Sequence, residues 1–559
     1  MSNRPPQMVL LDRYVRFVDE LKEVIEEGGD LPLDASIQSR LKHLPPCAST
    51  QEWADKQQEA IRDEIIRHRA EVQEPAFAIL RERKASRPGA MRKEPVTFSC
   101  DAGGYYRRVL DGINPRLPEL TGGKKAAVMN FLTIGISWPP SHHLRSYPQA
   151  GFIASCHDFL LALYFGTYRP GLSSPGCYLV INTWANSVAI VPPLPTRWVT
   201  TTSHCGIGAG VAILRHNFYG DYVLAELFPH QDSRSHLPSN KATLFLWWSP
   251  NSGSLAGRWT HKEVVLPLPA DDEGTCSFRA DMVFAVASTS LCWVDLRTGI
   301  LICDRIDMLA VGTEDDDPLV FRFIPLPREC ATKADPVSRW RSAEEYRTMF
   351  CVNREHIMFV CMDSYTQGCP LNKSMLTKWT LTSPLTRWKW HKYGHESFCL
   401  GDLLDDLPIL KNNSRLLMPS RPVISMEGSR VFTNLIVTGY DYKLGSRQLE
   451  ATGLYKLSID MHGDGGDRPR WEATVLEGSS AGSPSVHYSQ LFAAGISCCL
   501  EKTMEWESLQ RERSTSKSPS MEEVIDEDEC WEWVLPEGLP EDDRKEWLRK
   551  LNARPAIYA

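Results

Sequence analysis

The sequence contains no apolar run of the roughly 18 residues that a membrane-spanning helix needs. It also has no surplus of positive charge, because 62 Lys and Arg stand against 70 Asp and Glu, a net charge of −8. Domains that bind nucleic acid usually carry a basic surface, so we expect neither a nucleic-acid partner nor a membrane association. The N-terminal stretch has no apolar core followed by a small-residue cleavage site, and we therefore expect no secretory signal.

Cysteine is present but shows neither a disulfide nor a zinc pattern. Sixteen Cys are scattered over 559 residues, which favours reduced, buried thiols in the cytoplasm or nucleus. Two adjacent pairs, Cys498-Cys499 and His142-His143, are poorly spaced for chelation. We expect no metal and no cofactor.

The length, composition and hydrophobic patterning of the chain indicate five parts. At 559 residues it exceeds the size at which a single core keeps growing. We predict a helical N-terminal segment, a linker, a β-rich domain, a disordered acidic and Ser-rich segment, and a C-terminal strand with a short helix. The corresponding ranges are 1–83, 84–94, 95–500, 501–529 and 530–559.

The N-terminal segment carries an apolar stripe at alternating steps of four and three residues. It consists of Leu10, Tyr14, Phe17, Leu21 and Val24, and Gly28-Gly29 follows it. This spacing predicts one amphipathic helix that ends at the glycines. The stripe packs either on a second helix, which Ser49 and Glu52 would cap, or on a partner helix in a coiled coil. We favour the intramolecular packing because only two heptads are present.

The β-rich domain is built from similar units in which two apolar strands follow one another. Turn residues separate the strands, as is typical of all-β folds. The five strand pairs are Phe159–Phe165 with Tyr178–Asn182, Tyr222–Leu227 with Leu244–Trp248, Leu291–Asp295 with Ile300–Asp304, His356–Met362 with Leu376–Leu381, and Val431–Val437 with Leu454–Leu457. Three units end in Pro-Leu-Pro, at Pro195, Pro269 and Pro327.

Antiparallel units repeated at this length are typical of a β-propeller, in which neighbouring blades bury each other's faces. We predict a mainly β fold, a propeller-like array of five to six blades. Aromatic side chains of the outer strands would fill the space between blades. A pair of two-sheet sandwiches is the alternative architecture.

The third unit carries the most distinctive motif of the chain. It reads Cys292-Trp293-Val294-Asp295, then Gly299-Ile300-Leu301, Cys303-Asp304 and finally Pro325-Leu326-Pro327. This motif resembles a plant family, expanded in grasses, that is known as domain of unknown function 1618, with its core at 184–327. The closing strands are also similar to domains associated with plant F-box proteins, although the N-terminal helices contain no F-box. The resemblance implies no catalytic residue, cofactor or substrate.

We therefore assign a structural role to the motif. The residues concerned are Cys292, Trp293, Asp295, Gly299, Cys303, Asp304, Pro325 and Pro327. Two alternatives remain for them. Cys292 and Cys303 would face each other across the hairpin if the loop has two or four residues, close enough for a disulfide or half a metal site. Asp295 and Asp304 flank the same hairpin, and would be either an acid/base pair or turn-facing acids that accept loop amides.

Other groups of residues that could form a catalytic or binding site are better explained by structural roles. Cys156-His157-Asp158 are consecutive, so neighbouring side chains on a strand would point to opposite faces, which does not make a triad. The glycines of 206–210 lack the spacing of a dinucleotide loop. Trp247, Trp248, Trp388 and Trp390 would stack on sugars or bases, or else fill the core between blades; we favour the core.

The functional prediction follows from the absence of a convincing catalytic set. We expect a non-catalytic protein-interaction scaffold that binds an unidentified protein partner. The alternatives are a carbohydrate-binding protein or hydrolase that uses the central channel, and an F-box-related adaptor. A hydrolase would need two carboxylates about 5–10 Å apart in a pocket. Ser518, which precedes Pro519 in the acidic segment, is a candidate phosphorylation site.

Overall fold

The structure is a computed structural model, and its chain divides into two compact units, residues 1–499 and 500–559. All described residues lie in the first unit. They are 7–45, 50–85, 90–96, 103–117, 132–137, 151–166, 176–194, 210–216, 221–231, 238–249, 257–269, 278–287, 289–306, 319–330, 343–352, 356–362, 374–381, 388–392, 397–405, 416–427, 430–442, 449–460, 471–475 and 491–496. The expected segments 501–529 and 530–559, and with them Ser518, lie outside these residues.

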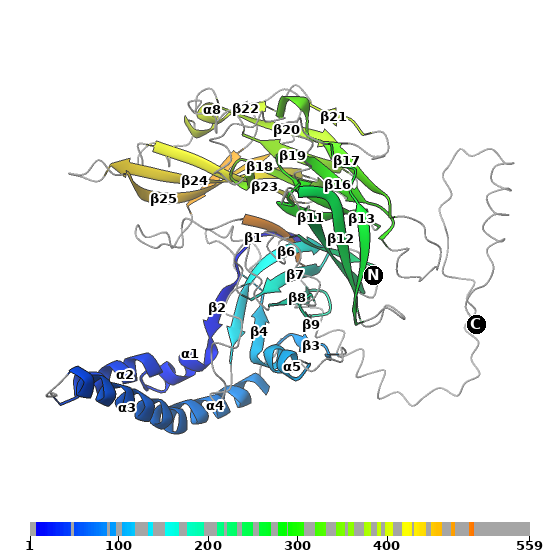
Figure 1. Cartoon of the computed structure of the whole chain (residues 1–559). Helices are drawn as coiled ribbons and strands as arrows, with labels where there is room; N and C mark the ends of the chain where they lie inside the picture. The colour runs from blue at the N-terminus through cyan, green and yellow to red at the C-terminus, as the bar shows by residue number, and fades with distance from the viewer. Residues whose placement is uncertain are drawn as a thin grey trace, which may run out of the picture. The chain divides into compact units, whose positions relative to one another are not determined.

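The described residues form a mainly β protein, in which five antiparallel sheets follow one another along the chain (Figure 1). The first sheet contains β6 (Gly151–His157), β7 (Leu160–Phe165), β8 (Cys177–Asn182) and β9 (Ser187–Val191), with β3 (Arg92–Lys93) parallel to β9. The second contains β10 (Val211–Arg215), β11 (Tyr222–Gln231), β12 (Pro238–Trp248) and β13 (Trp259–Val265). The third contains β14 (Met282–Val286), β15 (Ser290–Asp295), β16 (Gly299–Cys303) and β17 (Phe321–Pro325).

The fourth and fifth sheets are also antiparallel. The fourth contains β18 (Arg347–Val352), β19 (His356–Cys361), β20 (Met375–Leu381), β21 (Trp390–His391) and β22 (Ser397–Cys399), of which both β21 and β22 pair with β20. The fifth contains β23 (Leu416–Glu427), β24 (Arg430–Tyr442), β25 (Leu449–Asp460) and β26 (Trp471–Val475). Apart from β3 and β22, consecutive strands are neighbours in each of these five sheets, which is the arrangement that short antiparallel turns allow.

The sheets are buried on both faces, and the third sheet shows how. Its alternate side chains enter two different cores, as the two-residue period of a strand requires. Cys292 and Val294 belong to a core shared with the fourth and fifth sheets, whereas Leu291 and Trp293 belong to a core shared with the second sheet. The first and second sheets share a further core, which includes Tyr164 and Trp247. Two-sided burial explains why these strands have continuous apolar runs.

The first strands of successive sheets contact one another. The contacts join β6 to β10, β10 to β14, β14 to β18, and β18 to β23. A two-stranded ladder then pairs β1 (Gln7–Asp12) with β27 (Leu491–Ile496), near the two ends of the first unit. This ladder contacts both β23 and β6, the first strands of the fifth and first sheets.

A smaller sheet and a helix cover the outer face of the first sheet. The sheet pairs β2 (Arg16–Asp19) in parallel with β5 (Thr133–Ile136), which is antiparallel to β4 (Ile113–Arg116). The helix is α5 (Gly103–Gly112). Together they share a core with the first sheet. Among the described residues between the later strands are the short helices η4 (Arg328–Cys330), η6 (Ala343–Glu345) and α8 (Leu400–Asp405).

The N-terminal helices form an arm, here defined as residues 20–85, between β2 and β3 (Figure 1). The arm contains α1 (Glu20–Glu27), α2 (Leu33–Lys42), α3 (Thr50–His68), the π-helix η1 (Arg69–Gln73) and α4 (Glu74–Ala85). Two contacts organise it: α2 packs on α3, and α1 packs on η1 and α4. The π-helical turn ends at Gln73, two residues before Pro75, which has no N–H for the carbonyl of Glu71 and would clash with it in an α-helix.

The prediction of a single helix from the N-terminus was wrong over the first part of the stripe. Leu10 lies in β1 and Phe17 in β2, and α1 begins only at Glu20, where the Asp19 carboxylate accepts from the N–H groups of Leu21 and Lys22, each at 3.1 Å. Pairing with β27 and β5 overrides the helical spacing there. The expected helix end was correct, because α1 stops at Gly28 and Gly29 has φ 84°. The expected linker also begins and ends in regular structure, since α4 reaches Ala85 and β3 occupies 92–93.

Candidate functional site

The motif residues lie on three neighbouring strands of the third sheet. Cys292, Trp293 and Asp295 are on β15, Gly299 and Cys303 are on β16, and Pro325 ends β17. Gly299 is required by a close approach, because a Cβ there would overlap the carbonyl oxygen of Ile324 and the ring of Phe323. The Trp293 indole donates to the carbonyl of Gly210, just before β10, at 3.0 Å. These motif residues therefore hold the third sheet together and join it to the second.

Cys292 and Cys303 do not face each other, because the loop between β15 and β16 is 296–298, neither of the two lengths that facing would need, and both thiols are buried as expected. Cys292 is opposite Ile302, and Cys303 is opposite Leu291, so one residue of register separates them. Their side chains enter cores on opposite faces of the sheet. Burial raises the pKa of the Cys303 thiol to about 12 and that of Cys292 well above its usual value. Both behave as small apolar residues in the core.

Asp295 and Asp304 are likewise apart, at opposite ends of the hairpin. Asp304 accepts from the Ser290 hydroxyl at 2.8 Å and forms an ion pair with Arg322. Asp295 accepts from the backbone N–H of Arg297 at 2.8 Å and from that of Arg279 at 3.1 Å. Loop amides thus occupy the Asp295 carboxylate, as the turn-facing alternative predicted.

The carboxyl group that does lie beside Asp295 is that of Asp281, which the sequence motif gave no reason to select. Met282 is opposite Val294, so Asp281 and Asp295 are cross-strand neighbours at the next position. Asp281 accepts from the N–H of Leu296 at 3.0 Å. Burial, followed by the charges of Asp295 and Glu344, raises the pKa of Asp281 to about 7, and burial also raises that of Asp295.

Two arginines contact neighbours of this acid pair, namely Glu344 and Leu296. Arg13, between β1 and β2, forms an ion pair with Glu344 at 2.8 Å and donates to the carbonyl of Ile153 in β6 at 3.1 Å. Arg347, which is fully buried at the start of β18, donates to the carbonyls of Leu296 and Cys330, each at 2.7 Å. The cluster is a junction of the first, third and fourth sheets, and an acid with a near-neutral pKa lies within it.

The remaining candidates from the sequence have structural partners. His157 accepts the Arg215 N–H through Nδ1 at 2.9 Å, and Asp158 forms an ion pair with Arg215 at 3.1 Å, so Cys156-His157-Asp158 does not form a triad. Trp247 and Trp248 enter cores on opposite faces of the second sheet. Trp388 is exposed, and Trp390 packs partly against a core. Of the glycine run, only Gly210 lies in the described residues, as the acceptor for Trp293.

The arm is fixed at its base by one buried carboxylate. Glu20, the first residue of α1, accepts from Asn114 of β4 at 3.0 Å and forms ion pairs with Arg116 of β4 and, at 3.1 Å, with Lys84 of α4. Burial would raise the pKa of Glu20, but Lys84, Asn114 and Arg116 together lower it. Both ends of the arm are therefore tied to the same strand through a charged group.

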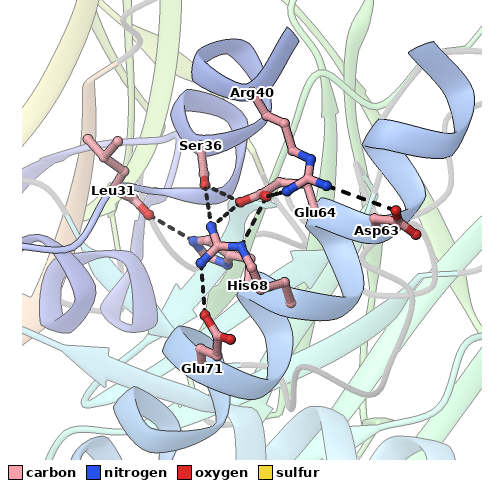
Figure 2. Close-up of polar contacts among 8 residues, drawn as sticks. Leu31, Ser36, Arg40, Asp63, Glu64, His68 and Glu71 are labelled. Atoms are coloured by element: carbon pink, nitrogen blue, oxygen red, sulfur yellow. Dashed lines mark hydrogen bonds and ion pairs between the residues drawn. The ribbon is translucent and has the colours of Figure 1, made fainter. Parts of the chain in front are cut away.

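The interface between α2 and α3 is polar in its centre (Figure 2). Glu64 of α3 is buried and accepts from the Ser36 hydroxyl and the Arg67 guanidinium, while Arg40 of α2 lies 3.5 Å from its carboxylate. Hydrogen bonds from Arg67 and Ser36 lower the pKa of Glu64 to about 2. His68, also buried, forms a hydrogen bond with the carbonyl of Leu31 at 2.8 Å.

Several large apolar side chains of the arm, in contrast, are exposed to solvent. Eleven large apolar side chains are exposed in the part of the chain that the structure describes, and five belong to the arm: Leu31, Trp53, Ile65, Ile66 and Ile79. Among the described residues, the buried apolar cluster of the arm consists of Val24, Ile25, Ala76 and Leu80, where α1 packs on η1 and α4. The α2–α3 part of the arm instead has a polar interior and apolar residues at its surface, the reverse of the usual distribution, and exposed apolar surface commonly marks interaction sites.

The described residues thus define a mainly β protein of small antiparallel sheets, each of about four strands, with an N-terminal helical region. Among these residues, no helix is long and apolar enough to cross a membrane, and no cluster of His, Cys, Asp or Glu is placed to hold a metal ion.

Residues 293–432 match the family described as "Protein of unknown function (DUF1618)", so the chain contains a domain of this family. The match overlaps the expected core, 184–327, over residues 293–327 and extends beyond it. No curated protein matches the sequence.

Among solved structures, a mutant of the GH43 protein BlXynB from Bacillus licheniformis matches with 8% identity and a TM-score of 0.27. The match covers 58% of this chain and 55% of that chain, so this chain spans about half the length of that protein. A similarity at this TM-score carries no inference about fold or chemistry.

Proposed function

We propose that the chain is a non-catalytic protein-interaction scaffold, a propeller of five blades from which the arm offers a docking surface to a protein partner. The observation that carries the proposal is the reversed polarity of the arm, with Glu64 and His68 buried and Ile65 and Ile66 exposed. Apolar side chains on a helical surface gain free energy when a partner covers them, by about 25 cal/mol per Å² of apolar area.

Contacts between the sheets support the propeller. The first strands contact one another in sequence from β6 to β23, and apolar cores lie between successive sheets. The ladder of β1 and β27 contacts both β23 and β6, so it would close the ring between the fifth and first sheets. The other face of the first sheet packs on the small sheet of β2, β4 and β5 and on α5, so these elements would lie at the junction where the ring closes.

The base of the arm supports a docking role. Glu20 ties α1, α4 and β4 together, which fixes the arm at its base. A preorganised surface binds more tightly than a flexible one, because less conformational entropy is lost on association.

The proposal is tested by capture of partners with the full chain and with charged variants of the arm. Ile65→Glu with Ile66→Glu should reduce the recovery of a specific partner at least tenfold. The matched control is Val265→Glu with Val320→Glu, two side chains that are also exposed but lie outside the arm, and it should leave recovery unchanged. Equal recovery by the arm variant and the wild type, or a chain that never retains a specific partner, contradicts the proposal.

One observation favours a second candidate, hydrolysis by an acid pair. Asp281 and Asp295 are cross-strand neighbours, and Asp281 has a pKa of about 7, as a general acid requires. Under this alternative the chain cleaves glycosides of a chromogenic panel, and both Asp281→Asn and Asp295→Asn abolish cleavage. If the wild type cleaves a glycoside and both variants do not, hydrolysis replaces the scaffold as the proposed function. If both variants still cleave, the activity is assigned to a contaminant. An F-box-related adaptor is tested separately, by binding to the ligase adaptor protein.

A further inference from the structure

Two buried thiols from different sheets are in contact. Cys330 lies in η4, directly after the last strand of the third sheet, and Cys361 ends β19 of the fourth sheet. Their Sγ atoms are 3.5 Å apart, and both cysteines are reduced. The two residues are 31 positions apart in the chain.

A single residue connects the two cysteines. Through its backbone, Arg347 is the cross-strand partner of Cys361 in the ladder of β18 and β19. Its guanidinium donates to the carbonyl of Cys330 at 2.7 Å and to that of Leu296 at 2.7 Å. The Cys330 N–H also donates to Pro327 at 2.8 Å, which closes the turn after the Pro-Leu-Pro sequence. The contact is therefore built by buried, directional hydrogen bonds on both sides.

We propose that Cys330 and Cys361 are a thiol oxidation site, which forms a reversible disulfide between the third and fourth sheets. A disulfide bond is about 2.05 Å long, so the two sulfur atoms need to approach by about 1.5 Å. Cys330 lies in a short 3-10 turn, where a side-chain rotation is easier than in the middle of a ladder. Cys292 and Cys303, in contrast, point to opposite faces of one sheet.

The oxidant is a low-molecular-weight disulfide of the glutathione type. One cysteine thiolate attacks this disulfide, forms a mixed disulfide and releases one thiol. The second cysteine, after losing its proton to solvent, attacks the mixed disulfide and releases the second thiol. The protein loses two hydrogen atoms as its two thiols become one disulfide, and the external disulfide is reduced to two thiols.

The experiment treats the native full chain with oxidised glutathione, blocks remaining thiols at low pH and maps tryptic peptides without reduction. The expected product joins peptide 329–333, which contains Cys330, to peptide 355–373, which contains Cys361. Dithiothreitol should separate the two. Because peptide 355–373 also contains Cys369, the variants Cys361→Ser and Cys369→Ser identify the partner: the first should lose the link and the second should keep it.

A second measurement does not depend on the variants. Closing a loop of this length should raise the Tm of the oxidised wild type by about 5 °C over the reduced protein, and Cys330→Ser should abolish the rise. Recovery of Cys330 fully alkylated after oxidation overturns the proposal, as does a link that survives in Cys361→Ser. The mapping on the wild-type chain decides the matter even if a variant fails to fold.

Discussion

The indole N–H of Trp390 donates to the carbonyl oxygen of Pro325 at 2.8 Å, and so joins the fourth sheet to the third. The same arrangement recurs between the second and first sheets, where Trp259 donates to Pro192 at 2.9 Å. In both cases a Trp that begins an outer strand reaches a carbonyl in or beside the Pro-Leu-Pro sequence of the preceding sheet. The repeated sequence thus has a physical role, since proline leaves the carbonyl of a strand end available to the neighbouring sheet.

Replacing one of these Trp donors by Phe should lower the free energy of unfolding, and the loss should be larger where the indole is more deeply buried. Trp390→Phe keeps most of the apolar contact and loses one partly exposed hydrogen bond, so we expect a loss of about 0.5–1 kcal/mol. Trp293→Phe removes a fully buried indole and leaves the carbonyl of Gly210 without this donor, and we expect about 2–4 kcal/mol. Chemical denaturation followed by tryptophan fluorescence measures both. Equal losses would show that burial does not set the cost.

Gly299 should tolerate no side chain. Gly299→Ala would press a Cβ against the carbonyl of Ile324 and the ring of Phe323, and we expect a loss of about 2–3 kcal/mol from overpacking. The matched control is Gly104→Ala on the exposed side of α5, where a Cβ meets only the end of the Arg108 side chain, at 3.7 Å. That change should stabilise the helix by about 0.5–1 kcal/mol. Thermal denaturation of the two variants should therefore move in opposite directions.

The central strands of each sheet could be predicted from the sequence, but the first strands could not. The five predicted pairs correspond to β7 and β8, β11 and β12, β15 and β16, β19 and β20, and β24 and β25. Long apolar runs identify strands buried on both faces. The first strands, such as β10 (Val211–Arg215) and β14 (Met282–Val286), are five residues long and lack a turn signal of their own.

The side chains of the candidate sites were harder to predict, because tertiary contacts bring them together. Asp281 precedes a strand and resembles any loop acid until the register places it beside Asp295. Cys330 and Cys361 meet only because two sheets pack face to face. Leu10 and Phe17 fit a helical spacing that strand pairing overrides. Local periodicity carries none of this information.

Asp281 should make the folded state less stable as the pH rises. Its pKa is raised to about 7 in the folded chain from an ordinary value of 3.8, so the folded state binds more protons than the unfolded state between these values. The stabilisation from protonation is complete below about pH 4 and is lost as the pH passes 7. Asp281→Asn keeps an oxygen for the Leu296 N–H but no longer titrates. The difference in Tm between Asp281→Asn and the wild type should therefore shift in favour of the variant as the pH increases from 5 to 8.

The charges that face Asp281 are Asp295, Glu344 and Arg279, and Asp295 also has a raised pKa. The variant should therefore flatten the pH dependence of Tm without removing it. A wild-type Tm that increases in step with the variant across this range would contradict the raised pKa.

Glu64 should determine whether the α2–α3 part of the arm is ordered. Glu64→Gln removes the buried carboxylate that Arg40 and Arg67 share and leaves them only the exposed Asp63 and Glu71, and we expect a loss of about 1–3 kcal/mol confined to the arm. The matched control is Asp63→Asn, an exposed carboxylate 3.9 Å from Arg40, which should cost at most about 0.5 kcal/mol. Hydrogen exchange distinguishes the two, because amides of α2 and α3 should exchange faster in Glu64→Gln while those of β15 and β16 stay protected.

Acid should reproduce the effect of the Glu64 variant in the wild-type chain. The folded-state pKa of about 2 lies below the ordinary value of 4.5, so the carboxylate stabilises the arm above about pH 4.5 and stops doing so as the pH falls toward 2. Exchange in α2 and α3 should accelerate over that range in the wild type and in Asp63→Asn, but not further in Glu64→Gln. If the arm of Glu64→Gln exchanges as slowly as that of the wild type at neutral pH, the buried ion pairs do not hold the two helices together.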